Sequence, residues 1–442
     1  MTTSPSRKPA TFSPGGPLRG TVTVPGDKSI THRAIIFSAL AEGETVISDY
    51  CRGEDCLNTL RAFRTMGITI DEQPRQLRVA GKGLWGLTEP STVIDCGNSG
   101  TGIRLLTGLL AGQDFFSVLT GDDSIRRRPM GRVVKPLRDM GACIAGRKGG
   151  ELAPIAITGT RLKGLSYSSP VASAQVKSSL LLAGLFAEDR TTITEPTLSR
   201  DHTERMFGFF GVPFERKGLA VSLVGRPAAG WSGKPELRVP ADISAAAFFL
   251  VGASIVSGSD VTIQDVGINQ TRSGVLDVLT EMGAKIEVLN RREEAGEPVA
   301  DLRVQASSLH GATIGGELIP RTIDEIPILC VAAAYAQGTT TITGAKELRV
   351  KESDRIAAVA RELTKMGVTV TEQPDGLTIT GLGGASGGRF RGGSYQSYGD
   401  HRIAMTLAVA ALAADGPILV DDTACIDTSF PLFRSKLLEL LT

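Results

Sequence analysis

The stretch PGDKSITHR, residues 25–33, joins a β-rich run (TVTV) to an apolar stretch (AIIFSAL) of helical character. We therefore predict that a helix begins here, directly after a strand. The first N–H groups of a helix have no partner within it and the helix dipole is positive there, so an anion is favoured. Lys28, Ser29 and Arg33 add charge-assisted donors. The stretch predicts a binding site for a phosphate or carboxylate. The alternative is a capped helix with solvated Lys and Arg side chains.

The same pattern returns once, since VPGDKS at residues 24–29 is echoed by VPADIS at residues 239–244. A chain of 442 residues is too long for one compact core. We therefore predict two domains, one formed by residues 26–239 and the other by residues 1–25 and 240–442. The two linkers, near 25 and 240, contain proline and suit a hinge, with the active site in the cleft between the domains. Two coincidental turns are the alternative.

A second repeat sets the expected architecture. Each copy begins with a run of Thr, Val and Ile, continues through a helical stretch and ends at a Met-Gly or Phe-Gly pair, where glycine adopts the left-handed cap conformation. Such a unit cannot bury its apolar helix face alone, so neighbouring units must share a core. A fifth helix ends at Gly141 and an incomplete unit covers 418–437, so six units are predicted, three per domain, in an α/β fold. The four complete copies are 44–67, 191–211, 260–283 and 339–367.

The composition excludes several classes of protein. Lys and Arg number 48 against 47 Asp and Glu, so no global basic field is present to attract nucleic acid. Only 5% of residues are aromatic, and no stripe of alternating basic and aromatic residues is found. No apolar run has the length of a membrane span. We expect a cytoplasmic protein that binds neither nucleic acid nor membranes.

The six cysteines are scattered without a CxxC pair, and none has histidine neighbours at metal-ligand spacing. Neither a metal site nor a disulfide framework is expected. Cys96 is interpreted as a small buried apolar side chain rather than a nucleophile. Residues 1–16 are rich in Ser, Thr, Pro and Gly, and we expect them to form a short disordered tail.

Polar clusters precede further helices in the first half of the chain. The glycine-rich turn DCGNSGTGIR (95–104) lets backbone N–H groups approach a ligand, although such a turn alone is weak evidence. In RRRPMG (126–131) we expect one guanidinium to point inward and two to be solvated, with three solvated side chains as the alternative. SAQVK (173–177) and SRDHTE (199–204) fit either ligand binding or ordinary capping boxes. Their recurrence at the same place in each repeat favours ligand binding.

The second half adds carboxylates. IDEIP (323–327) places an aspartate before an apolar helix. RVKESDR (349–355) mixes cations and anions, and we predict one helical turn on which Lys351 and Arg355 share a face. YGDHRIAM (398–405) has a similar mixture. A carboxylate among cations has a tunable pKa, as general acid–base catalysis requires. A structural ion-pair network is the alternative.

Taken together and in this order, the motifs resemble those of the 5-enolpyruvylshikimate-3-phosphate synthase family, from about Gly20 to Phe433. The resemblance implies two domains, each of three βαβαββ units in an inside-out α/β barrel. It implies transfer of the enolpyruvyl group of phosphoenolpyruvate to the 5-hydroxyl of shikimate 3-phosphate, through a tetrahedral ketal and with release of phosphate, in chorismate and aromatic amino-acid biosynthesis. It implies no metal or organic cofactor, and a monomer. The motifs are 26–33, 97–104, 128–131, 349–355 and 400–402.

The resemblance also implies a role for individual residues. Asp324 is assigned as the base toward the 5-hydroxyl, and Glu352 with Lys28 to protonation at carbon. The residues expected to bind shikimate 3-phosphate are Lys28, Ser29, Arg33, Ser173, Ala174, Gln175, Arg200, Asp324 and Lys351. Those expected to bind phosphoenolpyruvate are Lys28, Gly100, Arg128, Gln175, Arg355 and Arg402.

Four segments resemble the subclass of this family that is often tolerant of the herbicide glyphosate. Two features depart from it or from other relatives. Thr428 stands near a position where some relatives carry lysine, and Gly100 resembles the sensitive state. We therefore expect partial sensitivity. The four segments are 26–29, 173–177, 200–204 and 269–272.

Two other functions are alternatives to this one. The enolpyruvyl transferases that act on UDP-N-acetylglucosamine usually have a loop cysteine ahead of their arginine-proline pair, whereas residues 120–125 contain none. A non-catalytic protein that binds phosphorylated metabolites has no need for Asp324 and Glu352 beside its ligand. Phosphate release from phosphoenolpyruvate, with and without shikimate 3-phosphate, separates the three functions.

Overall fold

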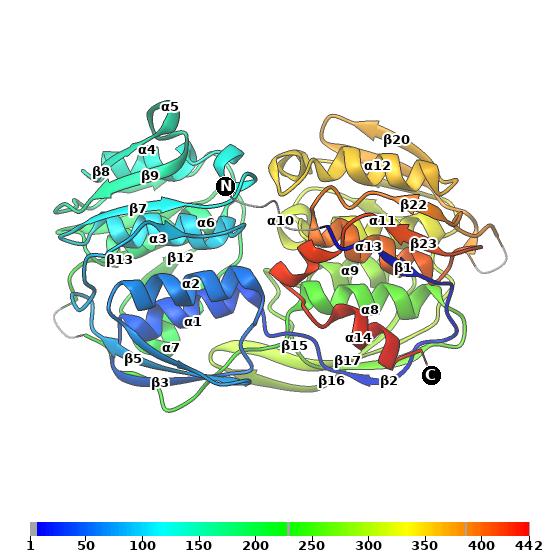
Figure 1. Ribbon diagram of the computed structural model, residues 1–442, viewed down its shortest axis with the longest axis horizontal. Helices are drawn as coiled ribbons and strands as arrows, with labels where there is room; N and C mark the ends of the chain where they lie inside the picture. Colours follow the sequence, from blue (N-terminus) through cyan, green and yellow to red (C-terminus); the bar gives the residue numbers. More distant parts are fainter. Residues whose placement is uncertain (1–6, 228–229, 385–386, 442) are drawn as a thin grey trace. The chain divides into compact units, whose positions relative to one another are not determined.

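The computed structural model describes residues 7–227, 230–384 and 387–441. Contacts divide the chain into two compact units. We call Gly26–Pro240 together with Glu293–Glu297 the central unit; it runs from blue to green in Figure 1. The terminal unit contains the described residues up to Pro25, Ala241–Arg292, and those from Pro298 onward.

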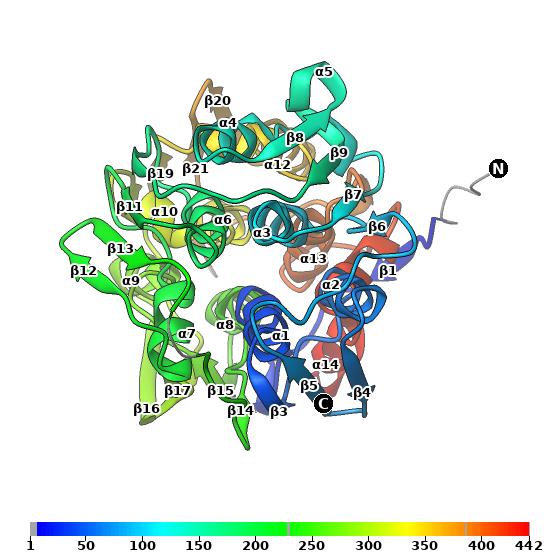
Figure 2. The ribbon, with the colours of Figure 1, turned by 90° about the vertical axis from the view of Figure 1, so that its left-hand side faces the viewer.

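The central unit carries its sheets outside and its helices inside, as Figure 2 shows around α1, α3 and α6. Its sheets have the strand orders β14-β3-β5-β4, β6-β7-β9-β8 and β10-β11-β13-β12. The strands are β3 (Glu42–Ser48), β4 (Thr69–Glu72), β5 (Gln76–Lys82), β6 (Ile94–Asp95), β7 (Phe116–Thr120), β8 (Cys143–Gly146), β9 (Leu152–Thr158), β10 (Ser166–Ser168), β11 (Arg190–Thr194), β12 (Glu215–Lys217), β13 (Ala220–Val224) and β14 (Leu237–Arg238). The helices are α1 (Lys28–Ala39), α2 (Glu54–Thr65), α3 (Gly100–Ala111), η1 (Ile125–Arg127), α4 (Gly131–Asp139), α5 (Arg147–Gly150), α6 (Ala174–Gly184) and α7 (His202–Phe210).

The terminal unit repeats this plan with the sheets β16-β17-β15-β2, β18-β19-β21-β20 and β1-β23-β22. Its strands are β1 (Ala10–Phe12), β2 (Arg19–Val22), β15 (Asp260–Gly267), β16 (Lys285–Glu294), β17 (Glu297–Gln305), β18 (Thr313–Ile314), β19 (Thr339–Ile342), β20 (Thr369–Gln373), β21 (Gly376–Thr380), β22 (Gly393–Tyr395) and β23 (Ile418–Val420). Its helices are α8 (Ile243–Ile255), α9 (Gly274–Glu281), α10 (Leu318–Thr322), α11 (Ile326–Tyr335), η2 (Lys346–Val350), α12 (Arg355–Lys365), α13 (His401–Ala411), η4 (Ala424–Thr428) and α14 (Phe433–Glu439).

Where the chain passes between the units, two strands belong to a different unit from the helix that follows them. Each sheet contains one parallel pair, and in four sheets a helix of the same unit connects the two strands. By contrast, β2 leads into α1 of the central unit but pairs with β15 of the terminal unit. Conversely, β14 leads into α8 of the terminal unit but pairs with β3 of the central unit. Each unit therefore completes one sheet with a strand that is far away in the sequence from its partner strand.

The inner helices are buried on every side. All residues of α8, α11 and α13 are buried, and α1 is buried from Ile30 to Ala39. A helix that is apolar all round needs such a position, whereas α2 and α12 bury only one face. The predicted α/β fold with helices inside and sheets outside is confirmed.

The glycines after Met and Phe end their helices as predicted. Gly67, Gly141, Gly211, Gly283 and Gly367 all have positive φ angles between 76° and 96°. L-residues with a side chain resist this conformation, so glycine fits these positions best. A local signal in the sequence thus marks five of the six predicted repeat units.

The prediction of a disordered tail over 1–16 is wrong for Ala10–Phe12. These residues form β1, which pairs antiparallel with β23, and Ala10 and Phe12 are buried. The sheet of the incomplete sixth unit thereby gains a third strand. This pairing joins residues about 400 positions apart, so the local composition did not indicate it. Residues 1–6 lie outside the described part of the chain.

Candidate functional site

The start of α1 carries the first of the predicted site residues. Asp27 accepts a hydrogen bond from the N–H of Ile30 at 2.9 Å and caps the helix. Lys28 is the first residue of α1, and its Nζ lies 2.9 Å from Oδ2 of Asp55 in the first turn of α2. The Lys28 side chain is 15% exposed. An ammonium group is therefore held beside a helix N-terminus, where an anion would be favoured.

Arg33 lies one turn further along α1 and is buried. Its guanidinium donates to Thr203 Oγ1 (2.8 Å), to Ser178 Oγ (2.6 Å) and to the carbonyl of Ser29 (2.8 Å). Burial lowers the pKa of Arg33 to about 10, and the positive charge of Arg200 acts in the same direction. The guanidinium still carries its charge at neutral pH, and it joins α1 to α6 and α7.

Two guanidiniums lie against the first residue of α3. A Cβ atom on Gly100 would lie 2.6 Å from a terminal nitrogen of Arg128 and 2.9 Å from one of Arg104. Arg104 donates to the Gly100 carbonyl at 3.1 Å and to Oε1 of Gln175 at 2.8 Å, while Nε2 of Gln175 donates to Thr101 Oγ1 at 3.0 Å. This network brings together three predicted site residues, Gly100, Arg128 and Gln175. Its fourth member, Arg104, was not predicted to bind a substrate.

The run of three arginines behaves as predicted. Arg128 is buried, Arg127 is exposed, and Arg126 is partly exposed and pairs with Asp123 at 2.5 Å. One guanidinium thus points inward and two reach the solvent side. Three consecutive side chains cannot all face one ligand, so two of the arginines remain on the solvent side.

The start of α6 is fixed by a buried carboxylate. Ser173 caps the helix through its hydroxyl, its own N–H donates to Oε1 of Glu195 at 3.2 Å, and Ala174 is the first helical residue. Lys177 lies fully buried between Glu195 (2.9 Å) and Glu204 (2.7 Å). Buried charges need such pairing. The triad sets the position of the α6 N-terminus.

His32 has a structural role. Its ring nitrogens lie 2.8 Å from Thr59 Oγ1 and 3.2 Å from the hydroxyl of Ser99, which caps α3. Burial lowers the pKa of His32 to about 3, and the charge of Lys28 contributes. The imidazole is therefore neutral near pH 7 and connects α1, α2 and α3.

The second group of predicted residues comes together in the terminal unit. Oδ1 of Asp324 lies 3.4 Å from Nζ of Lys351 and 3.4 Å from a terminal nitrogen of Arg355. Arg355 also contacts Glu352 at 2.7 Å. Arg402 donates to the backbone carbonyl of Asp324 at 3.1 Å. Two carboxylates and three cations are thus gathered at the starts of α11, α12 and α13.

Asp400 organises this cluster and was not among the predicted site residues. It accepts from Arg355 Nε at 2.8 Å and Ser353 Oγ at 3.0 Å, and it caps α13 by accepting from the N–H of Arg402. Burial opposes the charge of Arg355, but Asp400 and Glu352 outweigh it and raise the pKa of Arg355. Burial likewise opposes the charge of Asp400, but Arg355 keeps its pKa below the usual value. Both groups are therefore ionised.

The prediction that 349–355 forms one helical turn is wrong. Lys346–Val350 is a 3₁₀ helix, Lys351 has extended backbone angles, and α12 begins only at Arg355. Asp354 ends the irregular link, because its side chain accepts from the N–H of Ala357 and caps α12. Lys351 and Arg355 still meet, but at Asp324 rather than on a helix face.

The predicted site residues thus fall into one group in each unit, and Asp400 joins the second group. We call the first the central cluster and the second the terminal cluster. The central cluster consists of Lys28, Ser29, Arg33, Gly100, Arg128, Ser173, Ala174, Gln175 and Arg200. The terminal cluster consists of Asp324, Lys351, Glu352, Arg355, Asp400 and Arg402.

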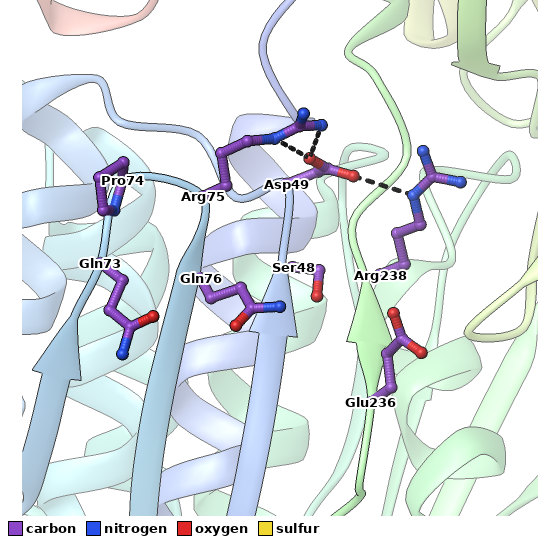
Figure 3. Close-up of a pocket in the computed structure, with 8 residues that line it drawn as sticks. All are labelled: Ser48, Asp49, Gln73, Pro74, Arg75, Gln76, Glu236 and Arg238. Atoms are coloured by element: carbon purple, nitrogen blue, oxygen red, sulfur yellow. Dashed lines mark hydrogen bonds and ion pairs between the residues drawn. The ribbon is translucent and has the colours of Figure 1, made fainter.

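A pocket of about 480 Å³ lies beside the ends of β3, β5 and β14, away from these residues (Figure 3). Asp49 accepts from Arg75 at 2.6 Å and from Arg238 at 2.9 Å, and Arg238 also contacts Glu294 at 3.1 Å. Burial would raise the pKa of Asp49, but Arg238 and Arg75 keep it below its usual value. Asp49 thus pairs with both arginines that line this pocket, and no lining residue belongs to the predicted site.

The described residues contain neither a metal-binding cluster nor a membrane-spanning helix. No group of three or more His, Cys, Asp and Glu side chains among them could hold a metal ion. No helix in the described ranges is long and apolar enough to cross a membrane. Cys96, considered above as a nucleophile, is buried, and burial raises the pKa of its thiol.

Comparison with known proteins gives a consistent result. Residues 12–437 match the family model described as EPSP synthase (3-phosphoshikimate 1-carboxyvinyltransferase). A 3-phosphoshikimate 1-carboxyvinyltransferase from Geobacter metallireducens is 56% identical, over 96% of this chain and 97% of the relative. The solved EPSP synthase of Acinetobacter baumannii has a TM-score of 0.86 at 47% identity, covering 98% of both chains. An enolpyruvyl transferase from Streptomyces tendae, at 16% identity and a TM-score of 0.79, shares the fold.

Proposed function

The chain belongs to the EPSP synthase family, and we propose that it transfers the enolpyruvyl group of phosphoenolpyruvate to the 5-hydroxyl of shikimate 3-phosphate, releasing phosphate. The observation that carries this function is the match to 3-phosphoshikimate 1-carboxyvinyltransferases over nearly the whole chain. The reaction belongs to the shikimate pathway, which leads to chorismate and the aromatic amino acids.

Both substrates carry phosphate and carboxylate groups, so bringing them together in water is opposed by charge repulsion. We propose that the cations of the two clusters and the helix N-termini offset this repulsion. Shikimate 3-phosphate binds Ser29, Arg33, Ser173, Ala174, Gln175, Arg200, Asp324 and Lys351. Phosphoenolpyruvate binds Gly100, Arg128, Gln175, Arg355 and Arg402, and Lys28 contacts both.

Asp324 acts as the base toward the 5-hydroxyl. The hydroxyl oxygen forms a bond to the central carbon of phosphoenolpyruvate, and its proton passes to the Asp324 carboxylate. The methylene carbon takes a proton from Glu352 or Lys28 and becomes a methyl group. Lys351 and Arg355, both 3.4 Å from Asp324, support its ionised form.

The resulting tetrahedral ketal then breaks down. The bond from its central carbon to the phosphate oxygen breaks, and the methyl group returns a proton to the group that had donated it, Glu352 or Lys28, which restores the double bond. Arg128 and Arg402 stabilise the phosphate as negative charge gathers on it. Arg355 keeps its charge throughout, because the Asp400 carboxylate raises its pKa.

We also propose partial sensitivity to glyphosate. A Cβ atom at position 100 would press on the Arg128 guanidinium. Glycine here leaves room for an inhibitor that competes with phosphoenolpyruvate. The resemblance of four segments to tolerant relatives argues for a weaker effect than in a fully sensitive enzyme.

We further propose that the enzyme works as a cytoplasmic monomer. None of the proposed roles requires a residue from a second copy of the chain. Light scattering coupled to size-exclusion chromatography at micromolar concentration tests this directly, and a mass near 93 kDa, roughly twice the chain mass of 46.5 kDa, would contradict it.

The function is tested by measuring phosphate release from phosphoenolpyruvate. We expect release with shikimate 3-phosphate and none with phosphoenolpyruvate alone. Release that depends instead on UDP-N-acetylglucosamine would identify the related transferase. Binding of both substrates without turnover would identify a non-catalytic protein.

A further inference from the structure

A buried ionic network lies directly behind Asp324. One terminal nitrogen of Arg272 lies 2.7 Å from Oε1 of Glu325, and the other lies 3.2 Å from Oδ1 of Asp242. Ser244 accepts from Arg272 and donates to Glu325. The Arg272 side chain is 3% exposed and that of Glu325 is 0% exposed. Nothing in the proposed reaction uses this network, although it contains three buried charged groups.

Arg272 is held in place by its own turn. Asn269 Oδ1 accepts from the N–H and hydroxyl of Thr271, and the Asn269 carbonyl accepts from the N–H of Arg272 at 2.8 Å. The next turn packs tightly on α10, since a Cβ atom on Gly274 would lie 2.7 Å from Thr322. The segment that carries Arg272 is therefore fixed against the segment that leads to Asp324.

Adjacent residues face different partners at the start of α11. Asp324 contacts Lys351 and Arg355, whereas Glu325 contacts Arg272 and Ser244. Glu325 occupies the N-cap position of α11, yet its side chain makes no capping hydrogen bond. A carboxylate at this position normally stabilises the helix start. Here the side chain is used for the buried network.

We propose that Arg272 and Glu325 are positioning residues that fix the backbone of Asp324, and this inference rests on the role proposed above for Asp324. The attraction of Lys351 and Arg355 pulls the Asp324 carboxylate toward the cations of its own cluster. The contacts of Glu325 with Arg272 and Ser244 hold the adjacent backbone from the opposite side. The two sets of contacts together fix the position of the Asp324 carboxylate. A base must lie within hydrogen-bond reach of the proton that it removes.

The main test replaces Glu325 by glutamine, which keeps the shape and one acceptor but removes the charge. We expect Glu325→Gln to lower kcat by roughly 10- to 100-fold, because a displacement of about 1 Å can cost that much. The KM of phosphoenolpyruvate should stay within about twofold, since Asp324 is not among the residues proposed to bind it. A loss of general stability would not produce this separation of kcat from KM in protein shown to be folded by circular dichroism.

A matched control removes a carboxylate between the same two segments. Asp277 on α9 contacts Arg321 on α10 at 2.5 Å, but this pair is 53% and 28% exposed. We expect Asp277→Asn to leave kcat and KM unchanged within about twofold. An equal loss of kcat in both variants would show that any weakened contact here impairs the enzyme, and would overturn the specific role of Glu325.

Two further variants complete the test: one replaces Glu325→Gln if that variant does not fold, and the other separates the positioning role from the role of Asp324. If Glu325→Gln fails to fold, Arg272→Lys carries the test, because lysine keeps the charge but cannot reach Glu325 and Asp242 together. A folded variant with unchanged kcat contradicts the inference. Asp324→Asn separates the two levels of the proposal. If it is inactive while Glu325→Gln is fully active, only the positioning role is wrong. If Asp324→Asn is fully active, the proposed role of Asp324 itself is wrong.

Discussion

The helices α1 and α8 follow nearly the same letters, VPGDKS and VPADIS, but their interiors differ in kind. Asp27 and Asp242 both cap their helices. Five residues after these caps, His32 corresponds to Ala247, and one residue later Arg33 corresponds to Phe248. All of these side chains are buried.

The partners of these helices explain the difference. Arg33 bonds to hydroxyl groups on α6 and α7, whereas Phe248 packs on Phe433 with the ring centroids 5.8 Å apart. At the start of α8, Asp242 also contacts Arg272 of the same unit. One helix start thus presents its cations in a proposed substrate site, and the other is tied into a structural network. A capped helix start becomes an anion site only when the residues that follow bring polar partners with them.

The largest effect is expected from removing Lys28, the cation in the first turn of α1 that has no counterpart in α8. Lys28→Met should lower kcat/KM by roughly 10²- to 10³-fold, as the loss of one strong charge-stabilising donor does in other enzymes. Ile243 is the matching residue of α8, and Ile243→Val should leave kcat/KM unchanged while costing about 1 kcal/mol of stability. Steady-state kinetics with both substrates measures the contrast. Equal activity of Lys28→Met and the parent would remove the functional distinction between the two helices.

The next effect concerns Gly26 and Ala241, which precede the two caps. A Cβ atom on Gly26 would lie 2.0 Å from the carbonyl oxygen of Asp49, so Gly26→Ala should destabilise the protein by about 1–3 kcal/mol. Ala241→Gly should cost about 0.5–1 kcal/mol through added freedom of the unfolded chain. Urea unfolding of both variants checks the order. A smaller loss for Gly26→Ala than for Ala241→Gly would contradict the close approach.

A third effect concerns His32, for which α8 has only Ala247. The pKa of His32 is lowered to about 3 from 6.5, so between these values the unfolded chain binds a proton that the folded chain does not. Its contribution to stability is therefore lost as the pH falls from about 6.5 toward 3, at up to about 1.4 kcal/mol per pH unit.

The measurement compares the parent with His32→Asn, which keeps hydrogen-bonding groups but does not titrate. Free energies of unfolding at pH 7, 6 and 5 should converge, because only the parent loses the His32 contribution on acidification. Parallel pH profiles would show that His32 titrates normally in the folded protein.

The smallest effect extends the comparison to α3, a third helix start. Gly100→Ala should raise the inhibition constant for glyphosate by roughly tenfold, equal to about 1.4 kcal/mol. The reason is that the added methyl group displaces the flexible end of Arg128. The KM for shikimate 3-phosphate serves as the internal control and should not change. Unaltered inhibition would exclude the steric explanation.

The candidate residues were predictable where their position depends on a helix start. Lys28, Gly100 and Ser173 lie in the first turn or at the cap of their helices, and caps are written in a few consecutive residues. Asp400 and Arg104 were missed as members of the site. Their importance comes from contacts with residues 45 and 71 positions away, which no local pattern shows.

Two local predictions failed for related reasons. Residues 10–12 look like a tail, but a distant strand pairs with them. Residues 349–355 have helical spacing of charges, but Asp354 caps a helix that begins only at Arg355. A strand far along the chain decided the first conformation, and the Asp354 cap decided the second. Composition and charge spacing are weak signals when a competing hydrogen bond is available.

The sequence by itself determined the repeat, the helix starts and the glycine helix ends, because each depends on the conformational preferences of neighbouring residues. Only the tertiary structure decided that β2 and β14 complete sheets in units to which their following helices do not belong. It alone also placed Asp324 between Lys351 and Arg355, with Arg272 behind it. Strand pairing and ion pairing act between residues far apart in the chain, so their partners are fixed only when the whole core packs.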